Sequence, residues 1–364
     1  MIDLMTLGLV TATSAMFLNK PKSIQKRLDE CFHSLNLCVK KGKMQIYPKL
    51  HAVKETEAGL DLVYQVPYGL SLESFENHID AIKFSAGGNV LLEKSGGFAV
   101  LKIRKNLPRM VEFREKAGGV IPLVVGESYD EFVSVDLIDV PHVMVAGLTN
   151  SGKSNFLHQS INTMLLNTQD VFLFILDFKR LEFAYLENHD RVKYCSDVIE
   201  AQGIIRFLLE EVYKRQEILK DAKCVKRTQY KGDLPYYVFV IDEFAEICPD
   251  LTNDPGEKEI LKDMQNRLSK ILALSRAVGI HGIVATQRPE AKILPGHLKT
   301  HFGAALAFRM LNADNSRVIL GRGGAEKLPT TKGRALFQYG ADCHEVQVPF
   351  FDPTDSHYLS FINS

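Results

Sequence analysis

Residues Gly147 to Ser154 read G-L-T-N-S-G-K-S and directly follow an apolar run from His142 to Ala146. Residues 155–166 come next and carry apolar side chains at the spacing of one helix face. Such a turn binds an anion when a strand precedes it and a helix follows it, because several backbone N–H groups then point at one site. The stretch therefore predicts a phosphate loop for a nucleoside triphosphate.

The loop and the residue after it supply the predicted ligands. Lys153 is expected to reach the β- and γ-phosphates, and the Ser154 hydroxyl is expected to complete the coordination sphere of Mg²⁺. ATP and Mg²⁺ are therefore the predicted cofactors. The predicted nucleotide contacts are Gly147, Leu148, Thr149, Asn150, Ser151, Gly152, Lys153, Ser154 and Asn155.

Two carboxylates follow a second apolar run. Val238 to Ile241 has the composition of a buried strand, and Asp242 and Glu243 come directly after it. The carboxyl ends of parallel strands meet at one edge of a sheet, so both acids are expected beside the phosphate loop. Asp242 is predicted to hold Mg²⁺, and Glu243 is predicted to be the catalytic carboxylate that orients the attacking water.

Two further strand ends carry polar residues in less specific patterns. Residues 282–286 form an apolar strand that leads to Gln287, which is either a γ-phosphate sensor or an ordinary polar cap. Asp177 and Lys179 follow the strand expected at 171–176, and they either pair with each other or line a contact between subunits. The residues alone leave both choices open.

Phosphoryl transfer is often assisted by an arginine that a neighbouring subunit supplies to neutralise charge in the transition state. Arg276 and Arg317 are the two candidates for this catalytic role. The sequence pattern does not choose between them, and each is also compatible with an ordinary surface position.

The bulk composition excludes several classes of protein. The chain has 364 residues, of which 46% are hydrophobic, and this is enough for a sizeable core and about two or three domains. Lys plus Arg equals Asp plus Glu at 44 each, which argues against a surface that is basic throughout but allows a local basic lining. The six cysteines form no C-x-x-C pair, so neither a zinc site nor a disulfide framework is expected and a reducing cytoplasm fits.

Residues 1–19 form a separate N-terminal segment. Residues 4–18 carry no charge, and lysines and arginines follow from Lys20 to Arg27. The apolar stretch is shorter than the roughly 20 residues of a typical span and is diluted by threonine and glycine. It is therefore either a short membrane anchor, with its basic side at the inner face of the cell membrane, or an ordinary amphipathic or buried segment of a cytoplasmic protein.

Residues 20–117 are predicted to form a helical segment and a small α+β domain, and the pair Gly118-Gly119 marks the joint to a third region, 118–364. Expected elements of the second region are a helix over 20–45, a strand at 59–66, a helix over 71–84 and strands at 89–92 and 98–103. In the third region the strands are expected at 120–125, 131–135, 142–146, 171–176, 236–241, 282–286, 304–308 and 333–337, with long helices over 196–220 and 258–278. This alternation predicts the α/β class with a mainly parallel sheet.

Several of these blocks together resemble the FtsK/SpoIIIE family of DNA-translocating ATPases. The matching blocks are Pro141 to Ser154, Leu176 to Lys179, Val240 to Ala245, Ser275 to His281, Ala285 to Pro289, Asp314 to Gly321 and Gly324 to Leu328. The small domain before them looks like the companion β domain of that family. The resemblance implies a RecA-like P-loop NTPase core that assembles as a hexameric ring.

The resemblance also implies a function. It implies ATP hydrolysis coupled to movement of DNA, which would be held through its backbone with little sequence specificity. It makes Gln287 a sensor and strengthens Arg317 as the arginine finger. The family's aspartate-proline-lysine stands here as Asp177-Phe178-Lys179, a change that we expect to be tolerated. The chain stops at Ser364 without room for the family's winged-helix domain, so directional loading at chromosomal guide sequences is not expected.

Short members of the family resemble the coupling ATPases of Gram-positive mobile elements. The leading prediction is therefore a DNA pump for conjugation or plasmid transfer, with relaxase, replication or secretion-channel proteins as candidate partners. The alternative is a protein-secretion ring ATPase of the same superfamily. A third interpretation is a module in which the nucleotide only holds an assembly together.

Overall fold

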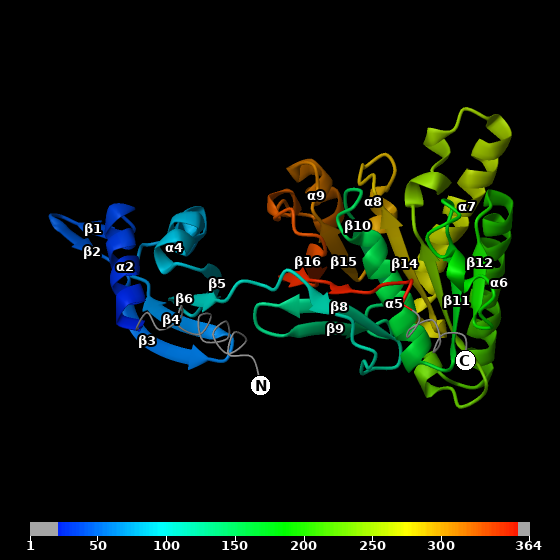
Figure 1. Cartoon of the computed structure of the whole chain (residues 1–364), viewed down its shortest axis with the longest axis horizontal. Helices are drawn as coiled ribbons and strands as arrows, with labels where there is room; N and C mark the ends of the chain where they lie inside the picture. The colour runs from blue at the N-terminus through cyan, green and yellow to red at the C-terminus, as the bar shows by residue number, and fades with distance from the viewer. Residues whose placement is uncertain (1–20, 356–364) are drawn as a thin grey trace, which may run out of the picture. The chain divides into compact units, whose positions relative to one another are not determined.

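The computed structural model describes residues 21–355 and divides into two units between Asn106 and Leu107 (Figure 1). The division falls before Gly118-Gly119, so residues 107–117 go with the second unit. Residues 4–18, predicted to be either a membrane anchor or an amphipathic or buried segment, lie outside the described residues. Within the described part of the chain, no helix combines the length and the apolar character that crossing a membrane requires.

The first unit contains a four-stranded antiparallel sheet in the order β3-β4-β6-β5. Its elements are α2 (Pro21–Ser34), β1 (Val39–Lys41), β2 (Met44–Ile46), β3 (Lys49–Thr56), β4 (Gly59–Gln65), α3 (Glu73–Asn77), α4 (Ile79–Ala86), β5 (Asn89–Ser95) and β6 (Phe98–Arg104). Alternate residues of β4, such as Leu62 and Tyr64, are buried in one apolar core with Phe32 of α2 and Ile82 of α4.

Three predictions for this unit need correction. The helix expected over 20–45 ends at Ser34, because Asn36 adopts a left-handed backbone (φ 51°) and a short hairpin, β1-β2, follows. Strand β3 was missed, since nearly all of its residues are exposed and no alternation marks it. The helix expected over 71–84 is divided into α3 and α4 at His78, whose backbone is not helical (φ −114°).

The second unit is built on a ten-stranded sheet in the order β12-β11-β13-β14-β10-β15-β16-β17-β8-β9. Its strands are β7 (Val111–Glu112), β8 (Pro122–Ser128), β9 (Phe132–Asp136), β10 (His142–Ala146), β11 (Val171–Leu176), β12 (Val192–Cys195), β13 (Tyr236–Ile241), β14 (Ile280–Thr286), β15 (Ala304–Phe308), β16 (Arg334–Tyr339), β17 (Asp342–Gln347) and β18 (Pro349–Phe350). Its helices are α5 (Lys153–Asn167), α6 (Val198–Asp221), α7 (Pro255–Leu274), α8 (Gly296–Lys299) and α9 (Ala313–Leu320). The neighbours from β12 to β15 pair in parallel, and those from β15 to β9 pair antiparallel.

Helices cover both faces of the parallel part of the sheet. Alternate residues of each buried strand point to opposite faces: Val240 packs in the core that contains α5, and Ile241 packs in the core that contains α6 and α7. The predicted strands at 142–146, 171–176, 236–241 and 304–308 are confirmed. Two-sided burial explains their continuous apolar runs, which are typical of parallel sheets.

The long helices begin and end for local reasons. Helix α6 starts after Asp197, whose carboxylate accepts hydrogen bonds from the backbone N–H groups of Ile199 (2.8 Å) and Glu200 (3.1 Å). Helix α7 starts after Asp254 in the same manner and ends at Leu274, a turn earlier than predicted. A separate 3₁₀ turn over Arg276–Val278 follows it and closes at Gly279, whose left-handed backbone (φ 75°) ends the segment.

The order of the parallel strands determines which candidate site residues lie close together. Strand β14 lies between β10 and β13, and all three run in the same direction. The residues that follow these strands, Gly147, Gln287 and Asp242, therefore meet at one edge of the sheet.

Candidate functional site

The phosphate loop needs glycine at two positions for steric reasons. Gly152 precedes α5 with φ of 116°, and a Cβ atom there would lie 2.7 Å from the backbone nitrogen of Gly333. A Cβ atom on Gly147 would lie 2.6 Å from Cβ of Phe308. Asn150 between them is also left-handed (φ 64°). These conformations turn the chain from the end of β10 into the first turn of α5, where N–H groups and the helix dipole favour an anion.

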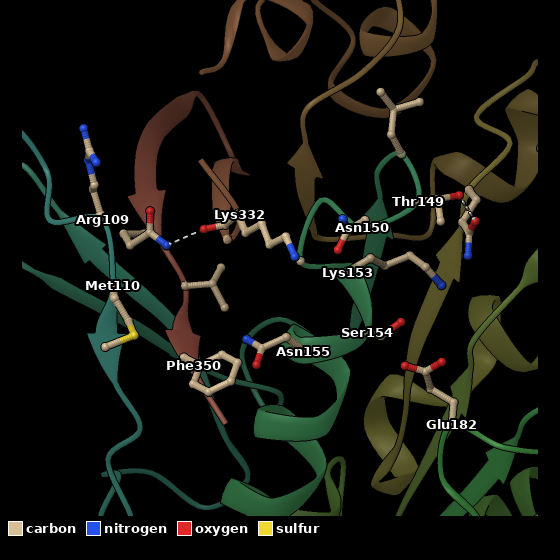
Figure 2. A pocket seen from close by; sticks show the side chains of 16 residues that line it. Arg109, Met110, Thr149, Asn150, Lys153, Ser154, Asn155, Glu182, Lys332 and Phe350 are labelled. Atoms are coloured by element: carbon tan, nitrogen blue, oxygen red, sulfur yellow. Dashed lines mark hydrogen bonds between the residues drawn. The ribbon is translucent and has the colours of Figure 1, made fainter. Parts of the chain in front are cut away.

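A cavity of about 490 Å³ opens beside this loop (Figure 2). Its volume is in the range of small-molecule and cofactor sites. It is lined by Arg109, Met110, Leu148, Thr149, Asn150, Gly152, Lys153, Ser154, Asn155, Glu182, Gln287, Lys332, Gly333, Gln347, Val348 and Phe350. The structure thus brings most of the predicted nucleotide contacts to one cavity, while Gly147 and Ser151 are not among its lining residues.

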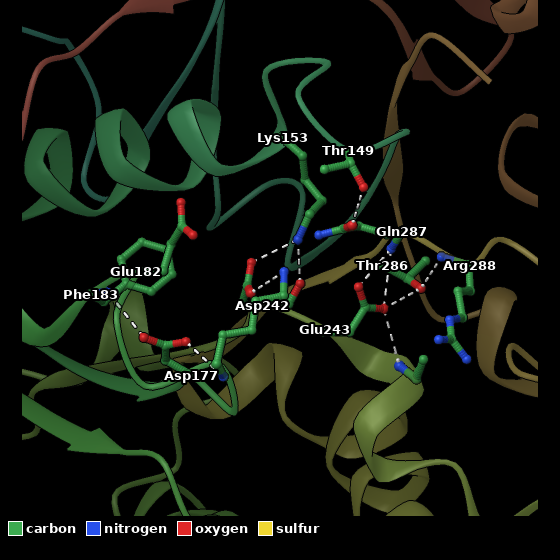
Figure 3. A network of polar contacts seen from close by, with 12 residues as sticks. Thr149, Lys153, Asp177, Glu182, Phe183, Asp242, Glu243, Thr286, Gln287 and Arg288 are labelled. Atoms are coloured by element: carbon green, nitrogen blue, oxygen red, sulfur yellow. Dashed lines mark hydrogen bonds and ion pairs between the residues drawn. The ribbon is translucent and has the colours of Figure 1, made fainter. Parts of the chain in front are cut away.

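Two lysines share one buried carboxylate at the edge of the sheet (Figure 3). The Lys153 ammonium lies 2.7 Å from Oδ1 of Asp242 and also donates to the backbone carbonyl of Asp242 at 2.5 Å. The Lys179 ammonium lies 3.1 Å from Oδ2 of the same side chain. Asp242 is fully buried, so this pairing is what keeps a charged carboxylate in the interior.

Of the two alternatives for Asp177 and Lys179, a side-chain pair is wrong, and a contact between subunits stays a prediction. Asp177 instead accepts hydrogen bonds from the backbone N–H groups of Lys179 (3.2 Å) and Phe183 (3.0 Å) and from the hydroxyl of Tyr194 (3.2 Å). It therefore fixes the turn that follows β11, and the Lys179 side chain extends from this turn to Asp242, which follows β13. The neighbouring order of β11 and β13 makes this contact.

Removing the second cation tests how much Asp242 depends on it. Burial opposes the charge of Lys179, but the Asp242 carboxylate outweighs this and raises the pKa of Lys179. We expect Lys179→Met to lower the free energy of unfolding by about 1–2 kcal/mol, less than for a fully buried pair, because Lys179 is 38% exposed and Lys153 remains. Urea denaturation measures the change. Lys193→Met, at an exposed pair with Glu200, is the matched control and should change stability by less than about 1 kcal/mol.

Glu243 and Gln287 lie on the side of Lys153 that faces away from Glu182 (Figure 3). The Glu243 carboxylate accepts from the hydroxyl of Thr286 at 2.8 Å and from the backbone N–H of Gln287 at 3.0 Å. The side-chain oxygen of Gln287 accepts a hydrogen bond from the Thr149 hydroxyl at 2.8 Å. One continuous network thus joins the phosphate loop, the end of β14 and the second acid after β13.

The two arginine candidates are not among the residues that line this cavity. Arg276 precedes β14, so it lies at the sheet edge opposite the phosphate loop. Arg317 lies on α9, where it is exposed and 2.7 Å from Asp314. Neither reaches the site of its own chain, and any catalytic role requires a second subunit.

Sequence reasoning missed Glu182, which lines the cavity near Ser154 (Figure 2). The imidazole of His158, with Nε2 at 3.6 Å from Oε1, is the main cause that lowers the pKa of Glu182 to about 2, and the Ser154 hydroxyl lowers it further. Glu182 is therefore ionised at neutral pH. Its only sequence signal was its place in the charged stretch after β11.

Comparisons with known proteins agree with the motifs. A model of the FtsK/SpoIIIE family matches residues 108–234. The DNA translocase FtsK of Borreliella burgdorferi is 31% identical over 232 residues, which are 60% of this chain and 28% of that protein. The DNA translocase FtsK of Leptospira interrogans is 31% identical over 250 residues, 63% of this chain and 25% of that protein. The chain thus spans about a quarter of the length of these curated relatives.

Solved structures share the architecture. The pCW3 conjugation coupling protein TcpA, in a monomer form with ATPγS, has a TM-score of 0.69 at 24% identity, over 93% of this chain and 98% of that one. The cytoplasmic domain of the type VII secretion ATPase EccC from Thermomonospora curvata has a TM-score of 0.56 at 22% identity, over 71% of this chain and 32% of that one. The predicted α/β fold class with a P-loop NTPase core is confirmed. The second unit of this chain is thus similar to the FtsK/SpoIIIE family, in agreement with the resemblance that its motifs predicted.

Proposed function

We propose that this chain is an ATPase that couples hydrolysis to the movement of DNA and acts as a ring, most simply a hexamer. The observation that carries the proposal is the meeting of Lys153, Asp242, Glu243 and Gln287 at one sheet edge beside the cavity. These residues come from three separate stretches of chain, and each has a distinct task in phosphoryl transfer.

In this proposal the side chains divide the work of hydrolysis. Lys153 exchanges its contact with Asp242 for the β- and γ-phosphates of ATP, which the backbone of the loop cradles. Glu243 orients and polarises the attacking water. Gln287 contacts the γ-phosphate. When hydrolysis removes this group, Gln287 shifts and moves the phosphate loop through its hydrogen bond with Thr149. Arg317 of a neighbouring subunit, or Arg276, neutralises charge in the transition state.

The donor set near the loop also fits Mg²⁺. Ser154 and Asp242 offer a hydroxyl and a carboxylate, the hard oxygen ligands that this ion prefers. Oδ2 of Asp242 is buried and lies 3.1 Å from the Lys179 ammonium, so a metal ion or its water shell would share this oxygen with Lys179 or displace the lysine. When bound, the ion would neutralise charge on the phosphates.

The names of the relatives support the choice of DNA and of conjugation. Two relatives are DNA translocases, and the structural neighbour over most of the chain is a conjugation coupling protein. We infer a cytoplasmic motor that feeds DNA to a transfer apparatus, with a relaxase, replication or channel protein as partner. The membrane anchor at residues 4–18 stays a prediction.

The deciding experiment is the ATPase rate of the purified chain against added DNA. We expect duplex or single-stranded DNA of unrelated sequences to accelerate turnover, and the acceleration to fall steeply with salt because phosphate contacts release counterions. Mass measurement with nucleotide, run alongside, should show an assembly rather than a monomer. Turnover that is unchanged by DNA of either form would contradict the proposal.

The second candidate function is protein secretion, which the EccC neighbour favours. A secretion motor should be accelerated by a substrate polypeptide and be indifferent to DNA. A module that only holds an assembly together should tolerate loss of Glu243, whereas a motor should bind ATP and stall.

A further inference from the structure

Two exposed apolar side chains lie at the end of the cavity away from the sheet edge. Met110 is 65% exposed and Phe350 is 55% exposed, yet both line the same cavity as the phosphate loop. Figure 2 shows them close together, with Lys153 and Ser154 across the cavity. Large apolar groups left in water next to a ligand site favour a binding role over a packing role.

The segments that carry these side chains are held firmly. Strands β7 and β18 pair in parallel, with Phe350 opposite Glu112. Asn155 of α5 clamps the second strand, because its amide donates to the carbonyl of Pro349 (2.7 Å) and accepts from the N–H of Phe351 (2.9 Å). Phe351 itself packs edge-on against Phe113, with ring centroids 5.0 Å apart. Strands β7 and β18 are therefore held in place by the same helix, α5, that begins at the phosphate loop.

The amide side chains at this end are engaged within the protein. Asn155 uses both its oxygen and its nitrogen in the clamp. Gln347 donates to the carbonyl of Lys332 at 2.8 Å and accepts from Arg334 at 3.1 Å. Amides are the groups that commonly distinguish one base edge from another, and here they are committed elsewhere.

We propose that Met110 and Phe350 form the nucleoside subsite, in which a purine stacks on the Phe350 ring and contacts the Met110 thioether. The inference rests on the proposed function, since it takes the phosphate loop to hold the triphosphate of the same molecule. Stacking on an aromatic ring tolerates different bases because every base has a π-face. The site therefore accepts ATP and GTP alike and prefers both to the smaller pyrimidine nucleotides.

Calorimetric titration of the full chain, in the presence of Mg²⁺, tests the subsite with ATP, GTP, CTP and inorganic tripolyphosphate. Wild-type protein should bind ATP and GTP within about fivefold of each other and CTP more weakly. Phe350→Ala should weaken ATP about tenfold to a hundredfold and leave tripolyphosphate affinity unchanged. Phe350→Tyr, which keeps the ring, should restore ATP affinity.

Phe84→Ala is the matched control, because Phe84 is 89% exposed on α4 in the other unit. It should leave every affinity unchanged. If Phe350→Ala disturbs folding, Met110→Ala replaces it, since Met110 lies outside any strand. A variant that retains wild-type ATP affinity overturns the subsite, and a preference for ATP over GTP above about tenfold overturns the relaxed selectivity. Failure of wild-type protein to bind either ATP or tripolyphosphate would instead overturn the proposed function.

Discussion

Glu243→Gln is expected to bind ATP with near wild-type affinity and to hydrolyse it about 10²- to 10⁴-fold more slowly, the usual loss when a positioned base is removed. The carboxylate of Glu243 is held by the Thr286 hydroxyl and the Gln287 N–H, which keep it in place. Glutamine keeps the shape and one acceptor oxygen and removes the charge that polarises water. Single-turnover hydrolysis, compared with equilibrium binding of ATP, separates the two effects.

The matched control for this variant is Glu246→Gln. Glu246 lies one turn further along the same 3₁₀ segment and is exposed. It should hydrolyse ATP at the wild-type rate. The glutamine at position 243 would place an amide N–H near the donor of Gln287, so a loss of stability of about 1 kcal/mol is expected and should be checked by melting. Turnover within about threefold of wild type would remove Glu243 from the chemistry.

Lys153→Ala is expected to reduce ATP affinity by about a hundredfold or more, since it deletes the loop's side-chain cation that is placed for the β- and γ-phosphates. It also leaves the buried Asp242 with Lys179 as its remaining cation among the described contacts. The nucleotide-free variant should therefore unfold more easily, by about 3 kcal/mol, the lower end of the cost of breaking a buried ion pair. Titration with ATP and urea denaturation measure the two effects.

Lys292→Ala is the control for Lys153→Ala, because it also removes one positive charge but at an exposed position. Lys292 is an exposed lysine 3.0 Å from Glu290, and its loss should change neither affinity nor stability measurably. Near wild-type ATP affinity in a folded Lys153→Ala protein would count against the assignment of the phosphate loop.

Much of the site was predictable because its residues follow apolar strands. Gly147, Asp242 and Gln287 each come directly after such a run, and parallel strands bring their ends to one edge. The partner of Lys179 was left open and Asp242 was not considered, because the partner depends on which strand lies beside β11, and sequence spacing does not give strand order. The roles of these residues in catalysis stay predictions until the variants are measured.

The end of the cavity that carries Met110 and Phe350 was not predictable from local patterns. Both are exposed apolar residues in stretches without periodicity: Met110 precedes the short strand β7, and Phe350 lies in the short strand β18 at the other end of the second unit's sequence. The same physical reason explains the missed strand β3, whose side chains are almost all exposed. The periodicity of apolar residues marks elements with a buried face, so elements that are mostly exposed are harder to predict from the sequence.

The clamp that Asn155 makes on Pro349 and Phe351 has a consequence for biosynthesis. Helix α5 emerges from the ribosome long before the strand that it contacts. The phosphate loop is therefore synthesised before Phe350, which we propose as part of the nucleoside subsite. On the proposed nucleoside subsite, we therefore expect a nascent chain to reach its full ATP affinity only after residues 349–351 have been synthesised.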